Sequence, residues 1–169
     1  MNDIPLSSES EAQAAQDLPR LIERMHRRYL DVVRIELSKH NYHDISPVQA
    51  VMLGTIGGTS GAEEISVRDL IERGYYLGSN ASYNLKGLVD GGYVDRQTSA
   101  RDKRSAQLKL SEKGLKVLSI VVALNKATAE SLVKNGGRDI QTAYQTLRQF
   151  ERRWTEVIRA EGPTTDDSL

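Results

Sequence analysis

The chain has 169 residues, a formal net charge of zero and no cysteine. A chain of this length forms one domain, or one domain with dimerisation arms. Without cysteine, disulfide bonds, thiol redox sensing and cysteine-ligated metal sites are excluded. The zero charge is an average, because residues 66–113 hold nine bases and six acids, a net charge of +3 that suits a polyanionic partner.

The sequence has no pattern typical of export or of membrane insertion. Its N-terminus lacks a basic segment followed by an apolar core, so no signal peptide is predicted. The longest apolar run, residues 117–124, is too short to cross a bilayer. We therefore expect a soluble cytoplasmic protein with no membrane partner.

The first predicted element is a long helix that follows an N-terminal arm. Residues 1–13 contain nothing that could fill a core, so a disordered arm is expected. Residues 14–40 are predicted to form a dimerisation helix, because apolar side chains recur there at helical spacing. These side chains are Leu18, Leu21, Ile22, Met25, Tyr29, Val32, Val33 and Leu37. The opposite face is rich in arginine, which we interpret as a solvated surface, with DNA contact as the alternative.

A polar loop and a short helix come next. Three residues of the loop are of metal-ligand types: His40, His43 and Asp44. No fourth ligand is close in the sequence, so we interpret the segment as an exposed loop. Ser46 and Gln49, with a proline directly after the serine, form a capping box that starts a helix. Its predicted inward residues are Val48, Val51, Met52 and Ile56, and the glycine-rich residues 57–61 are read as a linker.

The next two helices, joined by a short turn, predict a helix-turn-helix. The first begins at the capping box Ser66-Val67-Arg68-Asp69 and runs to about Arg73, with Gly74 at the stop position. The second is predicted over residues 79–91, with Ser79 as its cap. Its buried stripe consists of Ala81, Leu85, Leu88 and Val89.

The outward face of the second helix is short and polar, as a recognition helix in the DNA major groove requires. Its predicted DNA-binding residues are Ser79, Asn80, Tyr83 and Lys86 on the face itself, with Ser82 and Asn84 on its flanks, and Gly87 is placed on the same face. Asparagine can pair bidentately with adenine, whereas serine and lysine reach base edges or phosphates. Tyrosine offers a hydroxyl group, or a ring that packs on a thymine methyl group.

After this helix the sequence changes to the alternating period of strands. Residues 93–98 and 105–110 are predicted to form a hairpin beside the recognition helix, which makes a winged helix. The basic tip of the wing holds Arg101, Asp102, Lys103 and Arg104. Its arginines suit the adjacent minor groove, where negative potential is concentrated. Asp102 is predicted to hold the guanidinium of Arg104 in a fixed orientation.

At these residues the sequence resembles the MarR (multiple antibiotic resistance regulator) family. The resemblance rests on three motifs: Leu88-x-x-x-Gly92-Tyr93-Val94-x-Arg96, Asp102-x-Arg104 and Leu110-Ser111-Glu112-Lys113-Gly114. It covers residues 46–114 and implies a homodimeric winged-helix repressor or activator, often relieved by a small aromatic or anionic ligand. Members of the family often carry a basic residue in place of Tyr83 and a longer polar residue in place of Gly87. The recognition face of this chain is therefore less cationic.

Residues 113–161 are predicted to complete the dimerisation region with two helices, separated by the stop signal Asn135-Gly136-Gly137. The first, capped by Ser111, is apolar on most sides and is expected to be buried on most sides. The second carries an apolar seam that needs a partner. We predict a homodimer, with an intrachain hairpin as a partial alternative, and its dimerisation residues are Leu18, Leu21, Phe150, Trp154 and Ile158. Residues 162–169 are expected to be a disordered acidic tail.

The predicted fold class is mostly α with a small β-hairpin wing: a winged helix-turn-helix lobe over residues 45–112 plus a helical dimerisation region. The predicted function is that of a homodimeric transcriptional regulator, foremost a repressor, which reads a pseudo-palindromic operator in double-stranded DNA. A protein-interaction module without DNA binding is the alternative. The sequence has no nucleophile motif, and its histidines are not paired with carboxylates in a recognisable spacing, so neither an enzyme nor a cofactor is predicted.

A small-molecule site is predicted where the first long helix meets the helices that start at Ser46 and Ser111. Its expected lining combines apolar groups with a few polar tips: His26, Tyr29, Met52 and Tyr75. The family resemblance suggests a phenolic or carboxylate effector, which would act by favouring one spacing of the two DNA-binding lobes. A solid core at this junction is the alternative.

Overall fold

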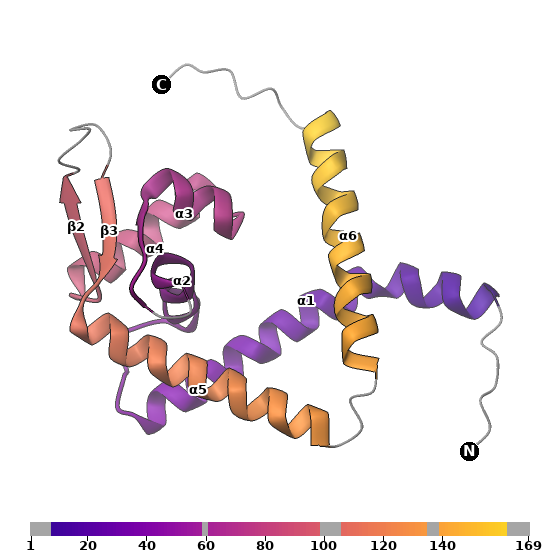
Figure 1. Cartoon of the computed structure of the whole chain (residues 1–169), viewed down its shortest axis with the longest axis horizontal. Coiled ribbons are helices and arrows are strands. Elements are labelled where there is room, and N and C mark those ends of the chain that lie inside the picture. The colour runs from indigo at the N-terminus through magenta and orange to yellow at the C-terminus, as the bar shows by residue number, and fades with distance from the viewer. Residues whose placement is uncertain (1–7, 59–60, 99–105, 135–138, 162–169) are drawn as a thin grey trace. The chain divides into compact units, whose positions relative to one another are not determined.

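A computed structural model of the chain describes residues 8–58, 61–98, 106–134 and 139–161 (Figure 1). Its elements in chain order are α1 (Ser8–Lys39), α2 (Pro47–Gly57), β1 (Glu64–Ser66), α3 (Val67–Gly74), α4 (Gly78–Asp90), β2 (Val94–Thr98), β3 (Ala106–Leu110), α5 (Glu112–Lys134) and α6 (Ile140–Glu161). They fall into two units, Met1–Asn125 and Lys126–Leu169. The predicted fold class is confirmed. Among the described helices, none is both long and apolar enough to cross a membrane.

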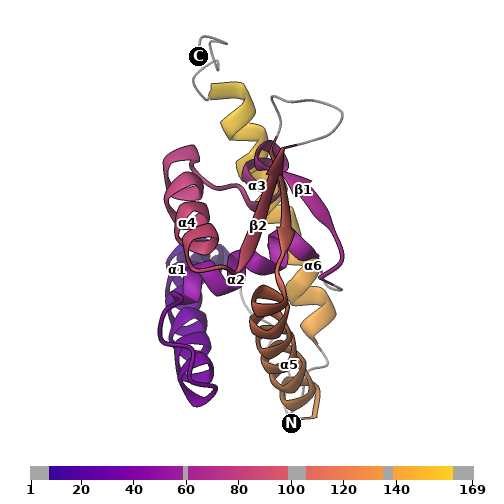
Figure 2. The ribbon, with the colours of Figure 1, turned by 90° about the vertical axis from the view of Figure 1, so that its left-hand side faces the viewer.

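The sheet has three antiparallel strands in the order β1-β3-β2. β2 pairs with β3 from Val94 opposite Leu110 to Thr98 opposite Ala106, which confirms the predicted hairpin. β1 pairs with the other edge of β3, and Figure 2 shows α4 beside β2 at the opposite side. β1 was not predicted, because three residues are too few to display an alternating pattern.

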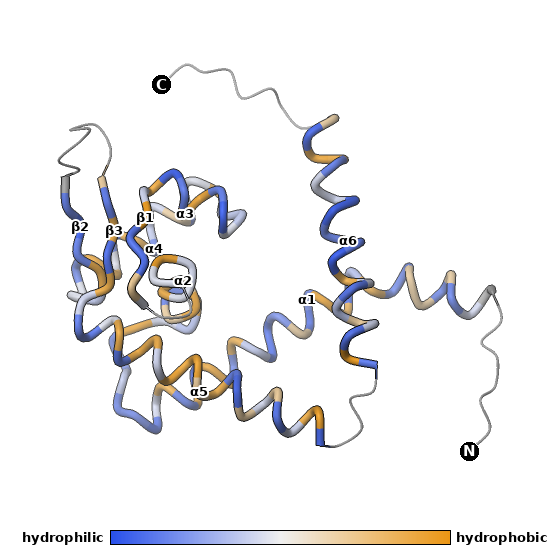
Figure 3. The backbone as a smooth tube through the Cα atoms, viewed as in Figure 1, coloured by the Kyte–Doolittle hydropathy of each residue, from blue (hydrophilic) through white to orange (hydrophobic). Residues whose placement is uncertain are grey.

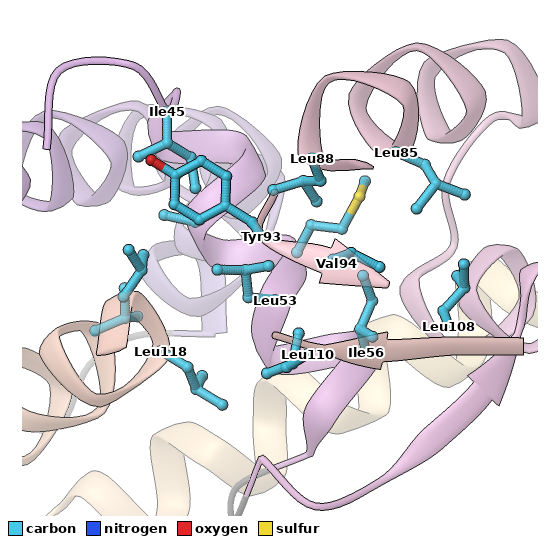
Figure 4. Close-up of a cluster of buried hydrophobic side chains, with 14 of the residues drawn as sticks. Ile45, Leu53, Ile56, Leu85, Leu88, Tyr93, Val94, Leu108, Leu110 and Leu118 are labelled. Carbon is cyan, nitrogen blue, oxygen red and sulfur yellow. The ribbon is translucent and has the colours of Figure 1, made fainter. Parts of the chain in front are cut away.

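The core of the first unit is built around α2. Ala50, Met52, Leu53 and Ile56 of this helix have no exposed surface. Figure 4 shows how side chains from α2 and α4, Val94 of β2, Leu108 and Leu110 of β3, and the start of α5 converge in one cluster. One predicted inward residue, Val48, is instead 37% exposed. Because α2 is apolar on most sides, residue spacing alone does not choose its inner face.

The two predicted capping boxes are present. Ser46 Oγ accepts a hydrogen bond from the Gln49 N–H at 3.2 Å, and Gln49 Oε1 accepts one from the Ser46 N–H at 2.9 Å. Ser66 and Asp69 exchange the corresponding bonds at 3.0 and 3.1 Å. Each box satisfies backbone N–H groups that the first turn of a helix leaves free. The boxes fix where α2 and α3 begin.

Two predicted helix ends are wrong by one or two residues. The cap of α4 is Leu77, which makes no side-chain cap hydrogen bond, so Ser79 lies inside the helix. α3 extends through Gly74, and Tyr75 takes the left-handed conformation with φ of 51°. The Tyr75 N–H then donates to the carbonyl of Ile71, which closes the last turn. Backbone bonding thus determines these ends more than the residue types that usually occupy them.

α1 packs on the lobe only through its C-terminal part. Val33 and Leu37 are buried, whereas Leu21 and Met25 near its middle are exposed apolar residues. The helix begins at Ser8 rather than at the predicted Ala14, so residues 8–13 are helical and not part of an irregular arm. In Figure 3 the exposed first part of α1 still carries apolar positions, which have no cover within this unit.

In the single chain α5 buries one face, so its expected burial on most sides would require a partner subunit. Only Gly114, Val117, Leu118 and Val121 are buried, and all four lie in its first three turns. The predicted Ser111 cap is present, because the Gly114 N–H donates to Ser111 Oγ at 3.1 Å. α6 contains no buried residue. The predicted stop signal at residues 135–137 and the tail at 162–169 lie outside the described residues.

Candidate nucleic-acid interface

The outward face of α4 is the centre of the candidate interface. Its inner face is held by Ala81, Leu85 and Leu88, which are at most 4% exposed, as predicted. The predicted DNA-binding residues that share the exposed face are Ser79, Asn80, Ser82, Tyr83 and Lys86. The largest side chain among them is that of Tyr83, and this residue is 77% exposed. The helix therefore presents hydroxyl, amide and ammonium groups on one accessible surface.

Asn84 and Gly87 are less exposed than the residues at the centre of this face. Asn84 is half-buried, and its Nδ2 donates to the Asn80 carbonyl at 2.9 Å on the same helix. Gly87 does not face solvent alone, because a Cβ atom there would lie 2.3 Å from Gln49 Nε2. The prediction that Gly87 belongs to the open polar face is therefore wrong. Spacing within one helix could not reveal a neighbour on α2.

Lys86 is paired along α4 with Asp90. The hydrogen bond to the Asp90 carboxylate raises the pKa of the Lys86 ammonium, so this group stays charged. Both side chains are largely exposed, so the pair adds little stability and can be exchanged for a phosphate contact. A hollow of about 240 Å³ adjoins it, lined by Val67, Ser82, Leu85, Lys86, Val89, Asp90 and Arg96.

The wing is described up to its tip. The β2–β3 ladder runs without interruption to Thr98 opposite Ala106. The four predicted tip residues, Arg101, Asp102, Lys103 and Arg104, lie outside the described residues, as does the predicted contact between Asp102 and Arg104. The strands leading to the tip are anchored by the buried side chains of Val94, Leu108 and Leu110. These contacts fix the base of the hairpin next to α4.

A polar cluster at the base of the wing was not predicted. The buried Tyr93 donates from its hydroxyl to Asp44 Oδ1 at 2.6 Å. Lys113 Nζ donates to Asp44 Oδ2 at 2.7 Å and to the Gly91 carbonyl at 3.0 Å, and it lies 4.0 Å from the centre of the Tyr93 ring. The cluster joins the loop before α2 to the end of α4 and the start of α5. Asp44, read from the sequence as part of an ordinary loop, therefore anchors that loop.

The charges of this cluster support each other. The hydrogen bonds from Lys113 and then Tyr93 lower the pKa of the Asp44 carboxyl. Burial, followed by the bond to Asp44, raises the pKa of the Tyr93 phenol. The bond to Asp44 also raises the pKa of the Lys113 ammonium. At neutral pH the carboxylate and the ammonium are charged and the phenol is neutral.

Asp44→Asn is expected to lower the free energy of unfolding at neutral pH by about 1 kcal/mol, a modest value because the carboxylate is largely solvent-exposed. The folded-state pKa of Asp44 is lowered from 3.8, so its stabilising contribution is present above that value. The contribution is lost as the pH falls through the folded-state pKa. Urea unfolding at about pH 7 and about pH 3 should therefore show a difference from wild type that shrinks in acid.

Asp31→Asn is the matched control, because Asp31 forms an exposed pair with Arg34 within α1. It should change the free energy of unfolding by less than about 0.5 kcal/mol at either pH. An Asp44→Asn effect of equal size at both pH values would contradict the role of the Asp44 carboxylate.

The four predicted ligand-binding residues differ in how deeply they are buried. His26 and Tyr75 are exposed, Tyr29 is half-buried and Met52 has no exposed surface. A hollow of about 290 Å³ near the end of α1 is lined by other residues, namely Arg34, Leu37, Ser38, Tyr42, His43, Ile45 and Pro47. In the part of the chain that the structure describes, no group of three or more histidine or acidic residues is arranged to hold a metal ion.

The predicted dimerisation residues lie on surfaces that are open in the single chain. On α1, Leu18 is half-buried and Leu21 is exposed. On α6, Trp154 is 42% and Ile158 66% exposed. Phe150 meets Trp154 edge-on with 5.8 Å between ring centres. These apolar side chains are unusual for a surface that stays in water.

A family model described as MarR family matches residues 43–105. The exopolysaccharide II synthesis transcriptional activator ExpG of Rhizobium meliloti (strain 1021) is 42% identical over 146 residues, which cover 85% of this chain and 73% of ExpG. A crystal structure of mutant E. coli MarR complexed with operator DNA is similar with a TM-score of 0.65, 22% identity and coverage of 79% of this chain and 92% of that one. Staphylococcus aureus MarR in complex with salicylate and kanamycin is similar with a TM-score of 0.66, 21% identity and coverage of 85% and 94%. The chain therefore belongs to the MarR family of winged-helix, DNA-binding transcriptional regulators.

Proposed function

We propose that the chain acts as a homodimer that reads a pseudo-palindromic operator through α4 and flanks it with the wing. The exposed polar face of α4 carries the proposal, because its inner side is fixed in the core while Asn80 and Tyr83 point outward. Two such helices about one DNA turn apart, ~34–36 Å, would enter successive major grooves. The related E. coli protein was crystallised with operator DNA, which supports this mode of binding.

The apolar surface of α6 supports the homodimer. Tyr144, Leu147, Trp154 and Ile158 follow one another at intervals of three, seven and four residues, which places them on one helix face, and they remain exposed in the single chain. Burying such side chains against a second copy contributes about 1.5–3 kcal/mol each. The exposed Leu21 and Met25 of α1 provide a second apolar surface of the same kind. We therefore propose that both helices take part in the contact between subunits.

The predicted repressor role remains a proposal, and activation is a second candidate. The relative that shares 42% identity is named as a transcriptional activator. A bound dimer that overlaps a promoter blocks it, whereas one bound upstream can recruit the transcription machinery. In vitro transcription separates the two roles. It compares a template that carries the protein's binding site upstream of the promoter with one in which that site overlaps the promoter.

A small aromatic or carboxylate compound is the proposed effector. Salicylate occurs in the complex of the S. aureus relative, which supports this class of ligand. His26, Tyr29, Met52 and Tyr75 remain the proposed contacts, although Met52 becomes accessible only if the core opens. A thermal-shift screen of aromatic acids tests the proposal. As a regulator that must reach DNA, the protein is proposed to act in the cytoplasm.

Operator binding is tested by selecting bound sequences from random DNA and then measuring affinity by gel shift. A dimer that makes 6–10 phosphate contacts should lose ~10³–10⁵ in affinity between 50 and 200 mM salt. Arg104→Ala is expected to weaken binding by about 1–3 kcal/mol, because it removes a guanidinium from the wing tip. The measurement is a gel-shift titration at matched salt.

Arg24→Ala serves as the control for charge, since Arg24 is an exposed arginine of α1. It removes one positive charge and should leave the affinity close to that of wild type. Equal losses in the two variants would assign the effect to overall charge or to DNA contact by α1. The absence of any salt-dependent affinity for DNA would instead favour a protein-interaction module.

A further inference from the structure

Gln49 connects the start of α2 to the middle of α4. Its Oε1 accepts from the Ser46 N–H at 2.9 Å, while its Nε2 donates to the Asn84 carbonyl at 3.4 Å. The second bond is partly buried and joins residues 35 positions apart. A helical carbonyl has a second lone pair, so Asn84 can accept this bond without losing its place in the helix. One side-chain amide thus completes a helix cap and also contacts α4.

Gly87 provides the space for this amide. A Cβ atom at Gly87 would lie 2.3 Å from Gln49 Nε2 and 3.5 Å from its Cδ. By contrast, a Cβ atom at Gly78, in the first turn of the same helix, would meet nothing within 4 Å. The missing side chain at Gly87 therefore forms a notch into which the Gln49 amide fits.

We propose that Gln49 is a positioning residue for DNA recognition, and that it sets the rotation of α4 on α2 by docking in the notch at Gly87. The inference rests on the proposed reading of DNA by α4. The leucine contacts on the inner face of α4 are apolar and have no preferred direction, so they allow small rotations of the helix. A hydrogen bond next to a steric notch is directional. α2 is a firm reference for α4 because its inner residues have no exposed surface.

Rotation of α4 should affect base recognition more than phosphate contact. Bidentate contacts with base edges depend on geometry, whereas phosphate contacts depend mainly on charge. Loss of the docked amide should therefore reduce the ratio of specific to nonspecific affinity and leave nonspecific affinity unchanged. A residue that only stabilises the fold would lower both affinities together.

The test compares Gly87→Ala, Gln49→Ala and the double variant with wild type. Each protein is titrated at matched salt with the operator selected by wild type and with an unrelated duplex, and its melting temperature is measured. In Gly87→Ala the colliding atom is the end of a flexible side chain, so the melting temperature should stay near that of wild type. We expect each single change to reduce the specificity ratio about tenfold. In the double variant the new Cβ atom occupies space vacated by the shortened residue. The fold-loss of the specificity ratio in the double variant should therefore be smaller than the product of the fold-losses in the two single variants.

Two further variants separate positioning from helix propensity and from capping. Gly78→Ala adds the same methyl group to α4 where there is open space, and it should keep the wild-type ratio. Gln49→Glu keeps an acceptor for the Ser46 N–H but cannot donate to the Asn84 carbonyl, so α2 keeps its cap while the ratio falls.

The proposal would be overturned if Gly87→Ala kept the specificity ratio of wild type. It would also be overturned if the fold-loss in the double variant equalled the product of the two single fold-losses. A fall in Gly78→Ala as large as that in Gly87→Ala would overturn it as well. If wild type itself preferred no DNA sequence, the proposed operator function would fail first, and this inference would fail with it.

Discussion

Leu88→Ala should lower the free energy of unfolding by about 2–5 kcal/mol. Leu88 lies on the inner face of α4, has no exposed surface and points into the cluster drawn in Figure 4. Its truncation removes apolar contacts and leaves a cavity that the packed neighbours fill only in part. Because domains are stable by only about 5–15 kcal/mol, this loss is a large share of the total. Urea unfolding at one fixed protein concentration measures it, since dimerisation would shift the midpoint.

Tyr83→Ala is the matched control on the opposite face of the same helix. Tyr83 is 77% exposed, so its loss should change the free energy of unfolding by less than about 0.5 kcal/mol. The same variant is expected to alter the sequence preference for DNA. The two residues thus separate the stability of the recognition helix from its proposed reading function. A loss below about 1 kcal/mol for Leu88→Ala would contradict the described core.

Trp154→Glu should convert the protein into a monomer and weaken operator binding by about 10²–10⁴-fold. Trp154 lies on the apolar face of α6 and is 42% exposed in the single chain. In the proposed dimer that face is covered, so the change removes an aromatic contact and buries a charge. A single lobe then binds without the high effective concentration that a linked second lobe provides. Light scattering measures the mass, and gel shift measures the affinity.

Arg153→Glu is the control for charge on α6. The side chain of Arg153 is 83% exposed and lies next to Trp154 in the sequence but on the polar side of the helix. This variant should remain a dimer. The far-ultraviolet circular dichroism of Trp154→Glu should show the helix content of wild type, because Trp154 belongs to the second unit and not to the core of the lobe. A Trp154→Glu protein that stayed dimeric at low micromolar concentration would exclude this face from the subunit contact.

Local sequence patterns predicted most elements of the lobe. The capping boxes at Ser46 and Ser66 identified two helix starts, and alternation identified β2 and β3. β1 could not be predicted because its three residues gain strand geometry only from pairing with β3. The start of α4 was misplaced, because Leu77 takes the cap position without the side-chain bond that serine usually supplies. At β1 and at the start of α4, backbone hydrogen bonding determines the structure more than the residue types do.

The candidate site was predictable as a surface but not as a set of contacts. Helical period placed Tyr83 and Lys86 outward, as the structure has them. Period could not show that Gly87 faces Gln49, or that Asp44 binds Tyr93, because these partners are far apart along the chain. Interactions between distant segments depend on the packed fold.

The pairing of β1 with β3 has a consequence for folding during synthesis on the ribosome. β1 precedes the recognition helix and β3 is the second strand of the wing, yet Glu64 lies opposite Lys109 and the two side chains form an ion pair at 2.8 Å. Closing so long a segment has an entropic cost that grows slowly with its length, and contacts between distant residues slow folding. A nascent chain therefore cannot complete this lobe until β3 has left the ribosome. The winged-helix lobe can therefore fold completely only after both strands of the wing have been translated.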